Sequence, residues 1–446
     1  MQSKRVQLIT LGCSKNKVDS EHLLRQIVSA NIDIVDEERD LKDSSADTVI
    51  INTCGFIKDA KEESIEMILN AIECKKSGYV KNVYVFGCLS QRYGDELWQL
   101  MPEVDGFFGA FNSVSVLEAL GGVWSHSLSN RRYLTTPSHY AYLKISEGCD
   151  RVCSYCSIPS IRGAHRSVPL EELLDEAHSL VDMGVRELIV IAQDTTYYGT
   201  DIYKEKRLAE LLSRLSSVDG LEWIRLLYAY PAAFPESVLD VMASNPKICK
   251  YIDIPLQHIN NNVLSNMRRS IDSNGTRRLI DSIRKKIPGV VLRTTMITGH
   301  PGEDEAAFNE LLEFVGEVKF ERLGAFTYSE EEGTWGAINL KDTILEEVKQ
   351  ERLERLMELQ SEISHSYNMS RVGSTERILI DSFDSGFLVG RSMAEAPEVD
   401  GEVLIDINKI DRNIDVNEFI GKFADVKIVG ADEYDLYGEI KNVLNR

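Results

Sequence analysis

The chain has 446 residues, which is long enough for two to four domains with cores of their own. Apolar residues make up 43% and charged residues 27%, as is ordinary for a soluble globular protein. The net charge of −21 argues against a nucleic-acid backbone as the main partner, because nucleic-acid affinity rests largely on cationic side chains.

The first residues, MQSKRVQLITLGC, lack the long apolar core of a signal peptide, and no apolar run approaches 18 residues. We therefore expect a cytoplasmic protein with no membrane partner. Eight cysteines in a large chain of this kind do not suggest a disulfide framework. Reduced thiols are more often metal ligands, catalytic groups or buried small apolar residues.

Residues 1–120 repeat one pattern three times, a short apolar run that ends at a cysteine and leads into a helix-like stretch. The runs VQLITLGC, DTVIINTC and NVYVFGC end at Cys13, Cys54 and Cys88. This alternation predicts βαβ units on a parallel sheet, where ligands gather beyond the carboxyl ends of the strands. All three cysteines fall at that edge, although buried cysteines in α/β loops are an alternative interpretation.

Residues 121–138 have no clear period and are predicted to be a linker. Between 139 and 370, six strand-like runs alternate with helical patterns, which predicts an open, partial (β/α)6 TIM-like barrel. A long amphipathic helix begins near residue 342 and is expected to pack along a domain edge. Residues 371–446 contain five short runs with Gly-containing turns and predict a small antiparallel β-barrel.

The stretch EGCDRVCSYCSIP places Cys149, Cys153 and Cys156 within eight positions. A zinc site completed by a distant histidine is one interpretation, but the usual zinc spacings pair one C-x2-C with another. An iron–sulfur cluster held by cysteine thiolates fits the spacing better. Three thiolates on four irons leave one iron open, as a catalytic centre requires.

This loop, with Tyr155 before its last cysteine and a strand just before it, resembles the signature of the radical S-adenosylmethionine (SAM) superfamily. The resemblance implies that Cys149, Cys153 and Cys156 bind a catalytic 4Fe-4S cluster whose free iron is chelated by SAM. It also implies that Tyr155 lies near SAM, and that cleavage of SAM yields a radical able to abstract hydrogen from an unactivated C–H bond.

Further candidates for holding SAM are Gln193 and Asp194, at the end of the second barrel strand, and Arg293 in the fifth. Polar groups at these positions could hold the ribose and the methionyl carboxylate. Ordinary strand-end polarity and helix capping are the alternative for each. His258 and His300 could be ligands or proton carriers, but we expect both to be structural.

The whole chain resembles the methylthiotransferase family of radical SAM enzymes. LGCSKNKVDSE, INTCGFI and VFGCLSQRY are similar to its N-terminal domain, and GRSMAEAPEVDGEV to its C-terminal TRAM domain. The resemblance implies a second, auxiliary 4Fe-4S cluster on Cys13, Cys54 and Cys88 that carries the sulfur. Cys74 and Cys249 match no motif of the family and are expected to be structural.

The resemblance also implies a reaction. One SAM supplies a methyl group to sulfur at the auxiliary cluster, and a second SAM yields the radical that removes hydrogen from the substrate carbon. That carbon then takes up the methylsulfide. Such an enzyme needs an external electron donor and a sulfur donor. The rival from another class is a non-catalytic iron–sulfur redox or sensor protein, which is disfavoured because a pure redox cluster is better served by four thiolates.

Family members modify either an adenosine of transfer RNA or an aspartate of a small-subunit ribosomal protein. Residues 371–446 hold nine Lys and Arg against sixteen Asp and Glu, a net of −7. This charge would repel RNA and attract a basic ribosomal protein, free or on the small subunit. The acidic residues that we expect to matter include Glu376, Asp381, Asp384, Glu395, Glu398, Asp400, Asp432, Glu433, Asp435 and Glu439.

The stretches SKNKVDSE and AQDTTYYG also resemble the ribosomal-protein branch of the family. We therefore predict a methylthio group added to the β-carbon of an aspartate in the twelfth small-subunit ribosomal protein, giving 3-methylthioaspartate. A transfer-RNA adenosine methylthiotransferase is the nearest alternative, and a solvated acidic face without a partner is the alternative for the charge. Contact with RNA is not expected to dominate.

Overall fold

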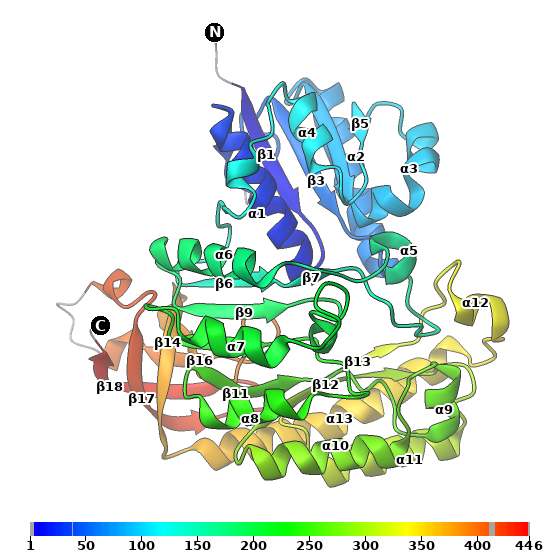
Figure 1. Cartoon of the computed structure of the whole chain (residues 1–446), viewed down its shortest axis with the longest axis vertical. Coiled ribbons are helices and arrows are strands. Elements are labelled where there is room, and N and C mark those ends of the chain that lie inside the picture. The colour runs from blue at the N-terminus through cyan, green and yellow to red at the C-terminus, as the bar shows by residue number, and fades with distance from the viewer. Residues whose placement is uncertain (1–3, 38, 410–414, 445–446) are drawn as a thin grey trace.

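The computed structural model describes residues 4–37, 39–409 and 415–444. An N-terminal α/β domain lies above a larger open barrel, and a small second barrel lies beside the larger one near the C-terminus (Figure 1). The predicted fold class is confirmed in all three parts. Within the described ranges, none of the helices is both long and apolar enough to span a bilayer.

The N-terminal sheet is parallel throughout, in the order β2-β1-β3-β4-β5. Its two edge strands, β2 and β5, were not predicted, because three and two residues are too short to show a period. All six residues of β3 are buried, since helices cover both faces of the sheet. The elements are β1 (Arg5–Thr10), α1 (Ser14–Ser29), β2 (Asp33–Val35), β3 (Thr48–Thr53), α2 (Lys58–Lys76), β4 (Asn82–Gly87), α3 (Cys88–Leu100), β5 (Gly106–Phe107) and α4 (Ser113–Ala119).

The central sheet has six parallel strands in the order β13-β12-β11-β10-β9-β6, and all six predicted runs form strands. β6 and β13 are its edges, so the barrel stays open between them. The strands are β6 (Tyr140–Lys144), β9 (Glu187–Ile191), β10 (Trp223–Leu226), β11 (Ile248–Asp253), β12 (Val291–Thr298) and β13 (Arg322–Thr327).

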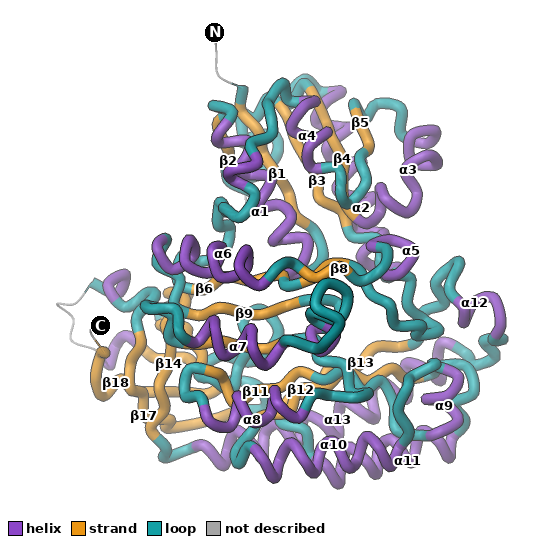
Figure 2. The backbone as a smooth tube through the Cα atoms, in the orientation of Figure 1, coloured by secondary structure: helices purple, strands orange, loops and turns teal. Residues whose placement is uncertain are grey.

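Helices cover the outer side of this sheet, where α8, α10 and α11 run along its lower half in Figure 2. The longer ones are α6 (Leu170–Asp182), α7 (Leu208–Ser216), α8 (Glu236–Ser244), α10 (Ser273–Lys286), α11 (Glu305–Val318) and α13 (Glu346–Arg371). The short elements are η1 (His126–Leu128), β7 (Ser146–Glu147), α5 (Ile158–Arg162), β8 (Arg166–Ser167), η2 (Thr195–Tyr197), α9 (Asn261–Asn266) and α12 (Trp335–Asn339).

The inner face of the open barrel packs on the C-terminal part of the chain. The Trp223 and Phe423 rings meet edge to face with centroids 4.8 Å apart. Buried Arg225 donates to the carbonyl oxygens of Ser392 and Met393. The long helix predicted from residue 342 begins at Glu346 and packs on β13 and α11. Because the C-terminal part covers this face, the barrel needs no seventh and eighth strands to bury its core.

The C-terminal barrel is closed in the order β14-β15-β16-β18-β17. One pair in it, β16 with β18, is parallel rather than antiparallel. A closed ring with an odd number of strands must contain at least one parallel pair, because alternating directions need an even number. The elements are β14 (Thr375–Asp384), β15 (Phe387–Arg391), β16 (Val403–Asp406), η3 (Ile407–Lys409), η4 (Val416–Glu418), β17 (Phe423–Ala431) and β18 (Leu436–Leu444).

Candidate active site

The loop with Cys149, Cys153 and Cys156 follows β7 at the end of the first barrel strand. Its backbone holds it in a tight turn, since Cys149 N donates to Gly163 O at 3.1 Å and Cys156 N to Cys153 O at 3.2 Å. Burial, with a contribution from the neighbouring Cys153, raises the pKa of the Cys149 thiol to about 11 and that of Cys156 to about 12. The three sulfur atoms therefore share one confined space.

Arg269 ties this loop to the barrel. Its Nη1 approaches Cys153 Sγ at 3.5 Å and Tyr155 Oη at 3.3 Å, and its Nη2 donates to Pro255 O at 2.5 Å. The guanidinium also lies over the Tyr230 ring, 4.3 Å from the centroid. Tyr155 is thus held next to Cys153, a candidate cluster ligand.

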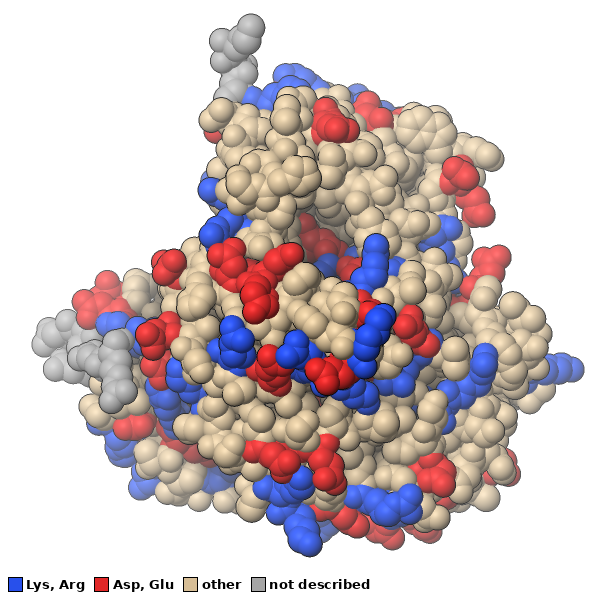
Figure 3. Space-filling view, viewed as in Figure 1, with Lys and Arg blue, Asp and Glu red and all other residues tan. Residues whose placement is uncertain are grey.

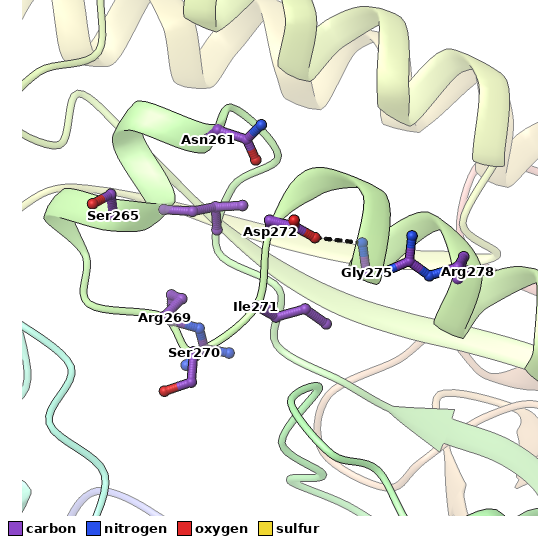
Figure 4. A pocket seen from close by; sticks show the side chains of 9 residues that line it. Asn261, Ser265, Arg269, Ser270, Ile271, Asp272, Gly275 and Arg278 are labelled. Atoms are coloured by element: carbon purple, nitrogen blue, oxygen red, sulfur yellow. Dashed lines mark hydrogen bonds between the residues drawn. The ribbon is translucent and has the colours of Figure 1, made fainter.

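Arg269 also lines an open cleft of about 710 Å³ between α9 and the start of α10 (Figure 4). Asp272 caps α10 at the edge of this cleft by accepting from Gly275 N at 2.6 Å. The cleft is therefore connected to the cysteine loop through one side chain. Its lining residues are Asn261, Leu264, Ser265, Arg269, Ser270, Ile271, Asp272, Gly275 and Arg278.

The structure brings Cys13, Cys54 and Cys88 together at the carboxyl edge of the N-terminal sheet. A Cβ at Gly12 would lie 2.7 Å from Cys54 Cβ, and one at Gly55 would lie 2.8 Å from the backbone of Cys88. Only glycine at these positions lets the three turns approach so closely. Burial raises the pKa of the Cys54 thiol to about 12, and the pKa of Cys88 is raised for the same reason.

Sequence reasoning missed the residue that connects the two sets of cysteines. Arg162 ends α5, six positions after Cys156, and its Nε donates to Cys88 Sγ at 3.2 Å. Its Nη2 donates to Asn16 Oδ1 at 2.7 Å. No spacing in SIPSIRG marks this arginine, so topology alone reveals it. The helix α5, which follows the barrel cysteines, therefore contacts the N-terminal cysteine set through Arg162 at the interface between the two domains.

An ion cluster surrounds this contact. Lys144 pairs with Asp19 and with Glu147, whose Oε2 lies 2.7 Å from Lys144 Nζ. Gln193 Nε2 donates to Glu147 Oε1 at 2.9 Å, while Gln193 Oε1 is buried without a partner among the described residues. A buried polar atom of this kind is costly unless something donates to it. Gln193 therefore offers a free acceptor at the rim where SAM is expected.

The two remaining candidates for SAM contacts have protein partners of their own. Asp194 caps η2 by accepting from Thr196 N at 2.9 Å, and it pairs with Arg151 Nε at 2.8 Å. Arg293 is the third residue of β12 and pairs with Asp253 at 3.0 Å and with Asp400 at 3.6 Å. The capping alternative thus describes Asp194 well, and Arg293 faces the C-terminal segment that fills the barrel.

The two histidines considered as ligands or proton carriers, His258 and His300, have structural surroundings. His258 is fully buried, and its Nδ1 accepts from Asn260 N at 3.0 Å. His300 Nε2 lies 3.2 Å from Ser154 Oγ, beneath the cysteine loop. Cys74 and Cys249 are 1% and 0% exposed and belong to hydrophobic cores.

Half of the acidic residues named for the C-terminal barrel do not form an outer face. Four of their side chains are at most 21% exposed and pair with arginines. Glu398 meets Lys17, Tyr140 and Tyr142 instead. On the face in Figure 3, acidic and basic side chains are intermixed rather than segregated. The four that face inward are Glu376, Asp381, Glu395 and Asp400, whereas Glu398 is 43% exposed and contacts the N-terminal domain and the barrel.

The expectation that all ten of these acidic residues lie on a surface that attracts a basic partner is therefore wrong in part, because counting charges along the sequence cannot separate internal ion pairs from solvated ones. Asp384, Asp432, Glu433, Asp435 and Glu439 are the remaining five. Among them, Asp432 already accepts from its own turn, at Tyr434 N and Asp435 N. Charge alone is a weak basis for choosing the substrate.

Three family models match the chain: the radical SAM superfamily over residues 143–315, the uncharacterized protein family UPF0004 over 5–109 and the TRAM domain over 372–440. A ribosomal protein uS12 methylthiotransferase RimO from Bacteroides fragilis is 51% identical over 440 residues, covering 99% of this chain and all of that protein. The RimO of Cytophaga hutchinsonii is 50% identical and covers 98% of each chain. The chain belongs to the RimO family of radical SAM methylthiotransferases. This is the branch that SKNKVDSE and AQDTTYYG predicted.

The radical SAM methyltransferase TsrM from Kitasatospora setae, solved with cobalamin and a 4Fe-4S cluster, has a similar fold, with a TM-score of 0.53. It covers 87% of this chain and 81% of its own at 13% identity, so the likeness concerns the fold alone. Membership in the RimO family implies SAM and 4Fe-4S clusters as cofactors.

The donor sets fit such clusters. No three His, Cys, Asp or Glu side chains among the described residues are grouped tightly enough for a single metal ion. A four-iron cluster is larger than one ion, so its thiolate ligands stand further apart. Each cysteine set supplies three thiols, and in each set the neighbouring cysteines contribute to a raised pKa, that of Cys54 in the N-terminal set and that of Cys156 in the barrel set.

Proposed function

We propose that the protein adds a methylthio group to the β-carbon of an aspartate in the twelfth small-subunit ribosomal protein, giving 3-methylthioaspartate. The observation that carries this proposal is that Arg162, six residues after Cys156 in the barrel, reaches Cys88 and Asn16 of the N-terminal domain, so that elements carrying the two three-cysteine sets join at one interface. The relatives named ribosomal protein uS12 methylthiotransferase, about half identical over nearly the whole chain, support the substrate.

Residues 139–370 are proposed to carry the radical chemistry and 1–120 the sulfur, with 121–138 as the linker and 371–446 as the TRAM barrel. Cys149, Cys153 and Cys156 would hold the cluster that binds SAM, and Cys13, Cys54 and Cys88 the auxiliary cluster. When bound, these groups and SAM supply the methyl group, the sulfur and the hydrogen-abstracting radical. The protein's share is to hold them close and to exclude water.

Four side chains are proposed around SAM, with unequal support. Tyr155 is favoured by its place beside Cys153, and Gln193 by its buried acceptor oxygen without a partner among the described residues. Asp194 and Arg293 have less support, because the capping bond and ion pairs described above already use their charge. Substitution of Gln193 should therefore weaken SAM binding more than substitution of Arg293.

The substrate is proposed to be a basic ribosomal protein, met free or on the small subunit in the cytoplasm. The five remaining acidic residues of the ten named above, Asp384, Asp432, Glu433, Asp435 and Glu439, are the candidates for its contact with the C-terminal barrel. An external electron donor and a sulfur donor complete the reaction, because each turnover consumes electrons and removes sulfur from the protein.

The decisive experiment uses the full chain, reconstituted anaerobically with iron and sulfide and supplied with SAM and a reductant. A peptide from the ribosomal protein should gain a methylthio group by mass spectrometry, and a transfer-RNA anticodon stem-loop should not. The Cys149→Ala variant is the control and should modify neither. Modification of the RNA would favour the transfer-RNA alternative. Clusters that change redox state while neither substrate gains mass would favour the redox protein.

A further inference from the structure

Arg162 is a charged residue in an unusual place. Its side chain is only 2% exposed, yet it keeps its charge, and it reaches out of the barrel into the N-terminal domain. Nε donates to Cys88 Sγ at 3.2 Å, Nη1 to Asp19 Oδ2 at 2.8 Å and Nη2 to Asn16 Oδ1 at 2.7 Å. Glu147 Oε2, on the barrel side, is 3.2 Å from Nη1.

Through Asn16 the same arginine reaches the other two cysteine turns. Asn16 Nδ2 donates to Leu11 O at 2.9 Å and to Thr53 O at 3.1 Å. Leu11 lies two residues before Cys13, and Thr53 directly precedes Cys54. One guanidinium therefore contacts Cys88 directly and holds the amide that ties together the turns before Cys13 and Cys54.

The carboxylates around Arg162 do not occupy its Nε–H, which donates to the sulfur of Cys88. Asp19 and Glu147 each carry one negative charge, and Lys144 and Arg162 each carry one positive charge, so these four groups balance. Arg162 meets the two carboxylates with Nη1, while Nε points away from them to Cys88. A thiolate at Cys88 would gain a charge-assisted hydrogen bond in a site closed to water.

We propose that Arg162 is a positioning residue for the auxiliary cluster: it donates to the Cys88 ligand, raises the reduction potential of that cluster and fixes it relative to the SAM loop. Hydrogen bonds to ligand sulfurs and nearby positive charge stabilise the reduced cluster, which carries more negative charge. This inference rests on the proposed function, which supplies the auxiliary cluster. Because α5 follows Cys156 by two residues, one rigid link serves both cysteine sets.

The barrel cluster has a matching arginine with a separate target. Arg269 Nη1 lies 3.5 Å from Cys153 Sγ and makes no contact with the N-terminal cysteines in the described structure. Arg162 and Arg269 thus act on different clusters, which allows a crossed experiment. Substitution at each position should move one potential and leave the other unchanged.

The test measures reduction potentials by redox titration followed by electron paramagnetic resonance, on full-length reconstituted protein without turnover. A variant with Cys149, Cys153 and Cys156 all changed to Ala isolates the auxiliary cluster. Adding Arg162→Gln should shift its one-electron reduction equilibrium about tenfold toward the oxidised state, the scale of second-sphere effects, which is about 59 mV. Arg162→Lys should give a smaller shift in potential, since lysine keeps the positive charge but lacks the planar guanidinium with its several fixed donors. Arg269→Gln should leave this potential where it is.

Arg132 provides the control for a merely structural role. It is buried at the same domain interface, where it pairs with Glu21 of α1 and with Glu176, and no thiol is among its partners in the described structure. Arg132→Gln should lower the melting temperature without moving the potential.

Three results decide the inference. A potential that is unchanged in Arg162→Gln, or one that Arg132→Gln moves equally, overturns it while leaving the proposed function intact. Loss of the cluster in Arg162→Gln with retention in Arg162→Lys supports it, because the positive charge is then what holds the ligand. Absence of any cluster on Cys13, Cys54 and Cys88 in the parent variant overturns the proposed function, and this inference with it.

Discussion

Both sets of cysteines bring three thiols together, but one set is local in sequence and the other is dispersed. Cys149, Cys153 and Cys156 lie within one loop, so a few backbone hydrogen bonds bring their sulfur atoms together. Cys13, Cys54 and Cys88 each follow a strand, and these strands are far apart in sequence. The cysteines meet only because the three strands, β1, β3 and β4, are neighbours in one parallel sheet. The first set is a local motif, whereas the second is a product of topology.

This difference has a physical consequence. A local loop can bind metal before the rest of the domain is ordered, because little chain entropy is lost in closing it. The dispersed set requires the sheet, the close approach of Gly12 to Cys54 and that of Gly55 to Cys88. We therefore expect the auxiliary site to be the more fragile of the two, and the substitutions below test that ranking.

The largest effects should come from removing one cysteine of either set. Wild-type protein should bind about eight irons, and Cys13→Ala or Cys149→Ala should each bind about four, as expected for two four-iron clusters. Only Cys149→Ala should abolish the formation of 5′-deoxyadenosine from SAM, because the proposal assigns radical cleavage of SAM to that set alone. Iron analysis and chromatography of the nucleoside measure the two outcomes.

The matched control is Cys249→Ala, which changes a cysteine buried in a core and distant in sequence from both sets. It should keep all of its iron, with a loss of stability from the small cavity. Unchanged iron in Cys13→Ala would mean that the N-terminal set binds no cluster. The claim that the two cysteine sets each hold one would then be wrong.

A smaller effect should follow from Gly12→Ala. Gly12 has φ +91°, and a Cβ there would lie 2.7 Å from Cys54 Cβ, so the substitution costs about 1–3 kcal/mol in backbone strain and displaces the Cys54 turn as well. We expect auxiliary iron to be lost in part, with the barrel cluster retained. Iron content and urea unfolding measure the change.

Gly78→Ala is the control for backbone strain alone. Gly78 has a similar φ of +81° and no atom within 4 Å of its would-be Cβ. It should show a comparable strain cost with full iron content. Equal iron in Gly12→Ala and Gly78→Ala would show that close packing of the turns is not what holds the N-terminal set together.

Much of the architecture could be predicted because it follows from the periodic spacing of apolar residues along the sequence. All six barrel runs form strands, and the five C-terminal runs close into a barrel. The short edge strands β2 and β5 carry too few residues to show a pattern. The parallel pair β16–β18 follows from closing an odd number of strands, which no single strand's sequence expresses.

The candidate cluster ligands could be predicted from the sequence because they are cysteines in recognisable positions. The side chains that contact them could not, because those contacts form only when distant parts of the chain pack together. Arg162 and Arg269 lie in stretches without any motif, and their roles come from which sulfur atoms they reach. For the acidic residues the error runs the other way, because the sequence suggested a surface role for side chains that the structure buries. Glu395 looked like surface charge in the sequence, but it is 1% exposed between Arg322 and Arg371. Charge composition does not distinguish a docking face from a buried ion pair.

The smallest expected effect concerns how far the dispersed set depends on the rest of the chain. Glu398, in the C-terminal segment, pairs with Lys17 Nζ at 2.7 Å and accepts from Tyr142 Oη at 3.1 Å. Lys17 lies in the first turn of α1, where its backbone N donates to Cys13 O at 3.2 Å. The helix α1, which directly follows Cys13, is therefore anchored by a residue more than 380 positions away in sequence.

Glu398→Gln should lower the free energy of unfolding by about 1 kcal/mol, because the pair with Lys17 is partly solvated and screened by water. Heating the reconstituted variant should release auxiliary iron at a lower temperature than in the wild type, with the barrel cluster released as before. Glu433→Gln is the control, an acidic residue of the β17–β18 turn expected to stay within about 0.5 kcal/mol. Earlier release of both clusters in Glu398→Gln would mean that this contact stabilises the whole protein, and the dispersed set would then be no more dependent on distant residues than the local loop.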